Sequence, residues 1–560
     1  MSFVPDDLDG ASWQAIEPHM NDLRDRALNC SGCLTKFIAD RSALAEIISE
    51  ARARLYIDMT CQTDDEAVQK AWMDFVENVE PKLSEYSDIL NRRLAGHEAV
   101  GDLPDRYDVL LKGMMTDIEI FREENIPLDT AVTKLDTEYN EICGAQTVEF
   151  DGEEKTFAQM AIYLENTDRA VREAAWRAVS ERRFEDSERV SEIYDELIRI
   201  RHQIATNAGF DGYQHYMFAA MHRFDYSIEH CLEFHDSIEA VCQPLRHKTD
   251  AERKQALGVE SLRPWDMGVD VKGRPPLTPF TDVQDMIDGC SRIFHSMSDE
   301  LGDLFDQLDA NDCLDLESRK GKAPGGYQYY LQKSRLPFIF MNAAGTQRNV
   351  ETMIHEAGHA FHSFYSGHLD LIHERDSPIE FAEVASMSME LLTHPQWTEF
   401  YSEQDADRAR RNHLEDIIAL MPWIATIDAF QHWIYANPEH TREERVEKWL
   451  ELGERFGSHL DYEGLDHIHE LSWQRQGHLF GVPFYYVEYG IAQLGALQMW
   501  QYHRRDSGNA LARYKAGLAL GYTRGLTELF EASGLALSFS EEHVSGIIAE
   551  IESALDEIPA

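Results

Sequence analysis

The chain has 560 residues, of which 43% are hydrophobic and 27% charged, and its formal net charge is −49. This composition is typical of a globular protein with a large buried core, and the sequence has no run of eighteen apolar residues that would predict a membrane span. Because so acidic a surface would repel a phosphate backbone, the charge argues against nucleic-acid binding.

The charge and the cysteines also indicate the environment of the protein. A solvated acidic surface is the simplest interpretation, but adaptation to salt and an acidic cleft for cationic peptides remain open. The eight cysteines form no dense framework, and Cys30-Ser31-Gly32-Cys33 is a lone C-x-x-C that favours structural thiols over a metal or redox site. The first residues, MSFVPDDLDG, lack the regions of a signal peptide, so we expect a cytoplasmic protein.

The first part of the chain, residues 1 to about 140, predicts successive amphipathic helices. A short hairpin is predicted next, because Asp151-Gly152 favours a tight turn between two strand-like runs. We place a boundary at this hairpin. It divides an N-terminal helical region, 1–155, from a larger region, 156–560.

Helical patterns continue through the larger region. They resume after Thr167, and this run ends at Gly209. Residues 263–280 are rich in proline and glycine and predict a loop. The apolar run 337–341 predicts a short strand, and other strand patterns are few. The fold class is therefore mainly α, with one small sheet.

The most informative motif is His355-Glu356-Ala357-Gly358-His359, an H-E-x-x-H in a segment whose apolar residues recur every three or four positions. This periodicity predicts an amphipathic helix. Residues four apart lie on one face of a helix, so both imidazoles can bind one metal ion while the glutamate reaches a water on that ion. The alternative is a pair of core histidines with local hydrogen bonds.

A catalytic zinc site usually has three protein ligands and one open position, so a third ligand is needed. The metzincin solution requires glycine at position 362 and histidine at position 365, whereas this chain has His362 and Tyr365. The other common source is a carboxylate on a following helix. The candidates are Asp370, Glu374, Asp376, Glu380, Glu383 and Glu390.

Two of these carboxylates lie on one predicted helix face. Pro378 can open a helix in which Glu383 and Glu390 point the same way, flanked by small residues. A charged residue on such a packed face is costly unless it is paired or bound to metal. We therefore predict Glu383 as the third ligand and Glu390 as the residue that orients a histidine, with a surface glutamate as the alternative for Glu390.

The sequences HEAGHAFH, beginning at His355, and EVASMSME, beginning at Glu383, resemble motifs of the M3 family of zinc oligopeptidases. Within it they are closer to the oligoendopeptidase F-like branch than to the thimet oligopeptidase branch. The resemblance implies that His355, His359 and Glu383 bind one Zn²⁺ ion, and that Glu356 is the general base. It also implies a large two-lobed helical fold with a deep substrate cleft and a small sheet beside the metal-binding helix, so region 156–560 would be catalytic.

Two further segments strengthen the resemblance. Residues 325–346 are similar to the glycine- and tyrosine-bearing loop and edge strand that precede the metal helix in this family. The exposed backbone of such a strand can pair with an extended peptide, although an ordinary core hairpin would give the same pattern.

The second segment is GHLFGVPFYYVEY, which begins at Gly477. It resembles the histidine-and-tyrosine segment of the family, in which His478, Tyr486 and Tyr489 would stabilise the tetrahedral intermediate. Tyr485 remains an alternative to Tyr486. An aromatic core helix with one packed histidine is the alternative for the whole segment.

These residues predict a zinc-dependent endopeptidase that hydrolyses internal peptide bonds, and the resemblance implies that its substrates are short oligopeptides. A zinc carboxypeptidase or dipeptidyl carboxypeptidase is the first alternative, and a catalytically silent peptide-binding protein, which has no need of Glu356, is the second. A structural metal site would require a fourth protein ligand, for which His362 is the nearest candidate. Oligopeptides are the expected partners, and the oligomeric state is not predicted.

Overall fold

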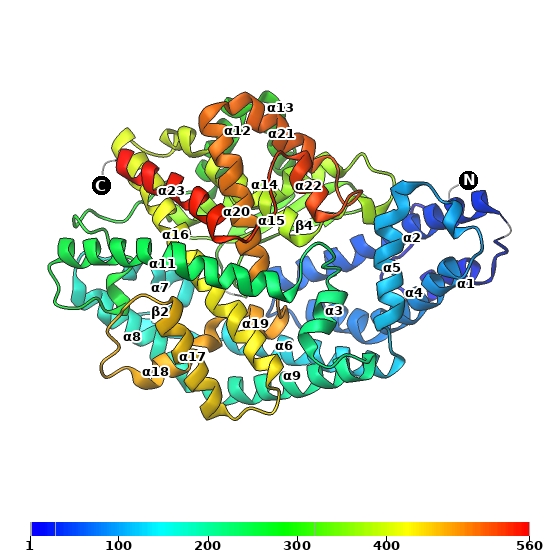
Figure 1. Cartoon of the computed structure of the whole chain (residues 1–560), viewed down its shortest axis with the longest axis horizontal. Coiled ribbons are helices and arrows are strands. Elements are labelled where there is room, and N and C mark those ends of the chain that lie inside the picture. The colour runs from blue at the N-terminus through cyan, green and yellow to red at the C-terminus, as the bar shows by residue number, and fades with distance from the viewer. Residues whose placement is uncertain (1–2, 29, 320, 559–560) are drawn as a thin grey trace.

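The computed structural model describes residues 3–28, 30–319 and 321–558, and it is built mainly from α-helices, as the sequence predicts (Figure 1). The N-terminal helices are α1 (Trp13–Asp25), α2 (Ser31–Cys61), α3 (Glu66–Asn78), α4 (Glu80–Ala95) and α5 (Asp108–Ile120). Their apolar faces enclose a core of their own, which includes Ile16, Phe37 and Phe75 and reaches Leu371. The next helix, α6 (Ile126–Gly144), already contributes Tyr139 to the main core.

The predicted hairpin is present as β1 (Thr147–Phe150) and β2 (Glu153–Thr156), which pair antiparallel. Asp151 and Gly152 have φ angles of 56° and 80°, as a two-residue turn of type I′ requires. The helices that follow are α7 (Phe157–Leu164), α8 (Arg169–Glu185) and α9 (Ser187–Ala208). As predicted, α9 ends at Gly209, which adopts a left-handed conformation with φ of 90°.

Helices of varied length, most of them packed around one large apolar core, form the rest of the body. They are α10 (Tyr213–Ala220), α11 (Ile228–Leu257), α12 (Val283–Met297), α13 (Asp299–Ala310), α16 (Glu403–Ala436), α17 (Arg442–Phe456), α18 (Asp466–Glu470), α20 (Tyr486–Arg505), α21 (Ser507–Leu518), α22 (Leu526–Ala532) and α23 (Glu541–Glu557). By length and composition alone α16 could cross a membrane, but 72% of its apolar window is buried inside the fold. Its apolar side chains are used in packing, as expected of a core helix.

The predicted loop 263–280 has a single short 3₁₀ turn, Pro264–Asp266, and a buried ionic anchor. The fully buried carboxylate of Asp266 accepts hydrogen bonds from Arg169 at 2.9 and 2.7 Å and from Arg172 at 3.0 Å. Both arginines lie on α8. The loop is therefore held against that helix by charge-assisted hydrogen bonds.

The small sheet consists of β3 (Leu314–Glu317), β4 (Tyr327–Leu331) and β5 (Leu336–Ala343), in the order β3-β5-β4. β5 pairs parallel with β3 and antiparallel with β4. The predicted strand 337–341 is therefore the central one, and the edge strand within residues 325–346 is β4. The helix that follows in the chain, residues 347–366, packs on both β5 and β4. Of these two strands, β4 has an edge that is unpaired among the described residues.

Candidate active site

The two helices of the site begin and end close to where the sequence predicts. α14 (Gln347–Ser366) carries the H-E-x-x-H motif, and α15 (Ile379–Leu392) carries the downstream glutamates. Asn349 Oδ1 accepts hydrogen bonds from the backbone N–H groups of Ala344 and Thr346, which fixes the start of α14. Gly367 caps its end, and Pro378 immediately precedes the first turn of α15.

A glycine inside the motif sets the distance between these helices. A Cβ atom at Gly358 would lie 2.5 Å from Ser386 Cα and 2.8 Å from Ala385 O, both of them backbone atoms of α15. Any larger residue would therefore push the helices apart. The close approach places Glu383, one turn before Ser386, opposite the motif histidines.

Three side chains meet across this contact. Glu383 Oε2 lies 3.4 Å from His355 Nε2 and 3.5 Å from His359 Nε2. The two imidazole rings are nearly perpendicular, with centroids 5.0 Å apart. One ligand atom from each residue lies within 4.8 Å of the others, an arrangement that can hold a metal ion. The structure thus brings together the three predicted ligands.

Glu390 links the site to a chain of histidines. Its Oε1 lies 2.6 Å from His355 Nδ1 and its Oε2 lies 2.8 Å from His413 Nε2. Although burial opposes ionisation, hydrogen bonds from both histidines hold the pKa of Glu390 well below its usual range. A carboxylate only accepts, so both nitrogens donate to it, and His355 Nε2 is left facing Glu383. His413 in turn contacts His394 at 2.8 Å, a connection that the sequence analysis missed.

Glu356 is 5% exposed and lines a cavity of about 760 Å³ together with His355 and Glu390. Burial raises the pKa of Glu356 to about 7. Glu383, in contrast, has a pKa of about 2, because the charge of His359 and a hydrogen bond from His355 outweigh the cost of burial. The pKa values of these two neighbouring carboxyl groups are thus shifted in opposite directions, as acid–base catalysis near neutral pH requires.

The histidine-and-tyrosine segment is broken, not one continuous helix. His478 lies on the short α19 (His478–Gly481), and the chain turns at Phe484, with φ of 66°, before α20 begins. His478 Nε2 lies 3.4 Å from the Tyr489 hydroxyl, and its ring packs edge-on against Tyr486 with centroids 4.9 Å apart. All three side chains line the same cavity as Glu356.

The structure gives Tyr485 a different place from Tyr486. Its hydroxyl donates a hydrogen bond of 2.8 Å to Glu383 Oε1, the oxygen that does not face the histidines. Tyr485 therefore fixes the orientation of the predicted third ligand.

Gln476 is another residue that the sequence did not predict as part of the site. The indole N–H of Trp423 donates to Gln476 Oε1 at 3.2 Å, and Gln476 Nε2 lies 2.7 Å from His478 Nδ1. Because the indole can only donate, the amide oxygen must face it and the amide N–H must face the histidine. Burial lowers the pKa of His478 to about 4, so the ring is neutral at neutral pH, with its proton on Nε2.

The remaining candidates lie outside this group of side chains. Glu374 pairs with Arg106 at 2.7 Å, and Glu380 accepts a hydrogen bond of 2.6 Å from Tyr226. Asp376 Oδ1 accepts from the N–H of Ser377. His362 is buried with its ring against Phe381, and it does not join the three converging ligands.

A second cavity, of about 1510 Å³, is lined by residues of α6 to α9, α11, the loop 263–280, the start of α14, α16 and the segment 460–482. It shares His478, Arg348 and Arg475 with the wall of the smaller cavity. Its volume exceeds the roughly 300–1,000 Å³ of most small-molecule sites, which suits a chain-like ligand. More basic than acidic side chains line it, in contrast to the acidic chain as a whole.

Two histidines from one helix and a carboxylate from the next are the ligand set of an H-E-x-x-H metallopeptidase. The sequence profile of peptidase family M3 matches residues 162–547, and the chain belongs to this family.

Individual relatives are distant in sequence but close in fold. Oligopeptidase PepF of Bacillus subtilis (strain 168) is 23% identical over 326 residues, which are 56% of this chain and 47%, about half, of PepF. The oligoendopeptidase F homolog of Borreliella burgdorferi is 22% identical, over 78% of this chain and 75% of its own length. The structure of PZ peptidase A with inhibitor 2 has a TM-score of 0.94 at 28% identity and covers 98% of both chains. The likeness in fold thus includes the N-terminal helices, where the resemblance in sequence is weakest.

Proposed function

We propose that this protein is a zinc-dependent endopeptidase that hydrolyses internal peptide bonds of short oligopeptides. The observation that carries the proposal is the convergence of His355, His359 and Glu383, with Glu356 beside them at the wall of a cavity. Membership of family M3 supports a peptidase, and the relatives named as oligopeptidase and oligoendopeptidase support short substrates. Cys231, Cys242 and Cys290 are buried free thiols, which supports a cytoplasmic location.

The donor set fits a zinc ion. Although burial opposes it, Glu383 and Glu390 raise the pKa of His355 well above its ordinary value, so the site favours positive charge between the two carboxylates. Two imidazoles and one carboxylate leave the fourth position of a tetrahedral ion open, as in catalytic rather than structural sites. Zinc held there would lower the pKa of a bound water from about 15.7 to about 7 and so supply a nucleophile at neutral pH.

The side chains of this protein would divide the remaining work. The Glu356 carboxylate takes the proton of the attacking water and then delivers it to the leaving amine, for which a pKa near neutrality is well matched. His478 Nε2–H and the Tyr489 hydroxyl donate hydrogen bonds to the oxyanion that develops on the scissile carbonyl. Each such donor contributes roughly 3 kcal/mol to the transition state. Tyr485 and Glu390 hold Glu383 and His355 in place.

Endopeptidase action is favoured over carboxypeptidase action by the shape of the site. The cavity beside the predicted ligands shares part of its wall with the larger cavity. The space for substrate therefore extends beyond the residues that would hydrolyse the peptide bond. An extended peptide would also find an unpaired strand edge at β4, whose Gln328 side chain donates to Ser363 on α14.

The proposal is tested with an unstructured peptide that is acetylated at one end and amidated at the other, incubated with protein, chelator and added zinc. Mass spectrometry is expected to show internal cuts that chelator abolishes and zinc restores. Release of only one or two C-terminal residues from peptides with free ends would support the carboxypeptidase alternative. Binding without cleavage by zinc-loaded protein would support the silent peptide-binding protein.

A further inference from the structure

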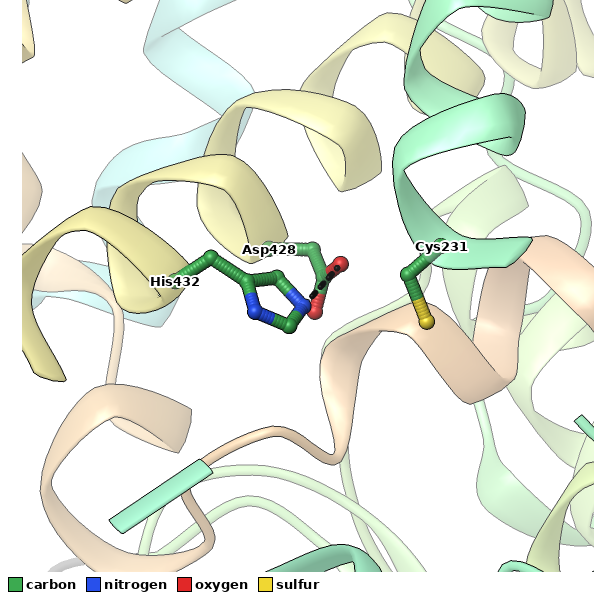
Figure 2. Close-up of side chains that lie close together, drawn as sticks. All are labelled: Cys231, Asp428 and His432. Atoms are coloured by element: carbon green, nitrogen blue, oxygen red, sulfur yellow. Dashed lines mark ion pairs between the residues drawn. The ribbon is translucent and has the colours of Figure 1, made fainter. Parts of the chain in front are cut away.

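A second group of metal-ligating side chains lies in the core between α11 and α16. Cys231 comes from α11, and Asp428 and His432 come from successive turns of α16 (Figure 2). A ligand atom from each lies within 4.8 Å of the other two. None of the three lines either of the two cavities described above, and Cys231 and Asp428 are fully buried, so the group is shielded from a substrate in those cavities.

Three nitrogen and oxygen atoms of Asp428 and His432 lack hydrogen-bond partners among the described residues. Asp428 is fully buried and its Oδ1 is unpaired, while His432 is 8% exposed and both of its ring nitrogens are unpaired. The contact of 3.4 Å between His432 Nε2 and Asp428 Oδ2 lacks the geometry of a hydrogen bond. A buried polar group without a hydrogen-bond partner destabilises a fold, and more so when it is charged. Asp428 Oδ1 and one ring nitrogen of His432, beside the thiol of Cys231, would therefore suit a bound cation.

A fourth residue, His235, holds the Asp428 carboxylate in place through one of its two oxygens. His235 lies one turn after Cys231 on α11, and its Nε2 is 2.8 Å from Asp428 Oδ2. The other carboxylate oxygen, Oδ1, is left free. A metal-binding carboxylate is commonly held in this way by a hydrogen bond to its second oxygen.

We propose that Cys231, Asp428 and His432 bind one divalent transition-metal ion of the zinc type, separate from the candidate active site. Binding releases the thiol proton of Cys231 to solvent, and the thiolate and carboxylate then balance the charge of the ion. A thiolate with an imidazole selects zinc-like ions over magnesium or calcium, which prefer oxygen ligands. The ion would join α11 to α16 and would give a partner to Asp428 Oδ1 and to one ring nitrogen of His432.

Cobalt distinguishes this site from the active site, because only this site contains sulfur. The full chain is expressed in cobalt-supplemented, zinc-depleted medium, so that a closed site can fill as the protein folds. We expect a near-ultraviolet sulfur-to-cobalt charge-transfer band and two metal ions per chain by elemental analysis. His359→Ala should lose activity and one metal ion but keep the band, so failure of the proposed function would leave this result intact.

The matched pair of variants is Cys231→Ser and Cys242→Ser, since both cysteines are fully buried on α11. Cys231→Ser should lose the band and one metal ion, whereas Cys242→Ser should keep both. If Cys231→Ser does not fold, the presence or absence of the band in the wild type and in His359→Ala still tests the proposal. A single metal ion per chain and no sulfur band in the wild type would overturn the proposal and leave a buried Asp428–histidine ion pair.

Discussion

Replacement of Gly358 by alanine tests whether the spacing of α14 and α15 creates the metal site. The new Cβ would lie 2.5 Å from Ser386 Cα and 2.8 Å from Ala385 O, whereas unstrained carbon contacts are about 3.5–4.0 Å. Because both partners are backbone atoms, no rotamer change relieves the clash. The helices must therefore separate by about 1 Å locally.

That separation moves Glu383 away from the histidines. Metal ligands must sit within about 0.2 Å of their ideal distances, and a misplacement of 1 Å can lower a rate about 100-fold. We expect Gly358→Ala to bind zinc more weakly in a chelator competition and to lose at least about 100-fold in kcat/KM. Overpacking should also lower the free energy of unfolding by about 1–3 kcal/mol.

Gly546 provides the control. It lies inside α23, and a Cβ there meets nothing within 4 Å. Gly546→Ala should leave activity unchanged and stabilise the protein by about 0.5–1 kcal/mol in urea denaturation. Wild-type zinc affinity and kcat/KM in Gly358→Ala would refute the argument that helix spacing defines the site.

The other predictions concern single side chains. Glu356→Gln should keep its zinc by elemental analysis but lose nearly all turnover; a variant of wild-type activity would reject its role as the base. Glu390→Gln should weaken zinc affinity about 10- to 100-fold, measured by chelator titration, because His355 loses a charged acceptor. Gln476→Glu should move the proton of His478 to Nδ1 and lower kcat about 100-fold with little change in KM; unchanged kcat would exclude His478 as an oxyanion donor. Asp266 has a pKa below its usual range, because arginine hydrogen bonds outweigh burial, so it stabilises the fold above about pH 4 and this stability is lost as pH falls. Asp266→Asn should cost roughly 3 kcal/mol in urea denaturation at pH 7 and less at pH 3; an equal loss at both would contradict this.

Sequence patterns predicted correctly those features that depend on a few neighbouring residues only. Apolar residues every three or four positions predicted α14, and Asp151-Gly152 predicted a turn that needs two positive φ angles. The i, i+4 spacing of His355 and His359 placed both on one helix face without any knowledge of the fold. Period and turn chemistry are properties of short segments, so a single sequence contains them.

Sheet order and the course of the chain before α20 could not be read in this way. The apolar run 337–341 looks the same in an edge strand and in a central one, and its position depends on β3 and β4, which pair with it from both sides. Gly481 and Pro483 do signal an interruption of the helix after His478, but they do not give the direction in which the chain turns. In the fold, Phe484 has a positive φ and donates its backbone N–H to Gln431 on α16, a contact between distant segments.

Contacts between distant segments show why parts of both sites escaped prediction. Trp423 contacts Gln476 across 53 positions of sequence, and Cys231 meets Asp428 across nearly two hundred, which is of the order of a whole domain. No spacing rule links such residues, because their proximity is created by the packing of whole helices. In the fold they are identified by buried polar atoms that either lack a hydrogen-bond partner or make a hydrogen bond whose donor and acceptor are fixed. The predicted active site and the proposed second metal site are therefore supported by the same kind of observation, although only the first left a motif in the sequence.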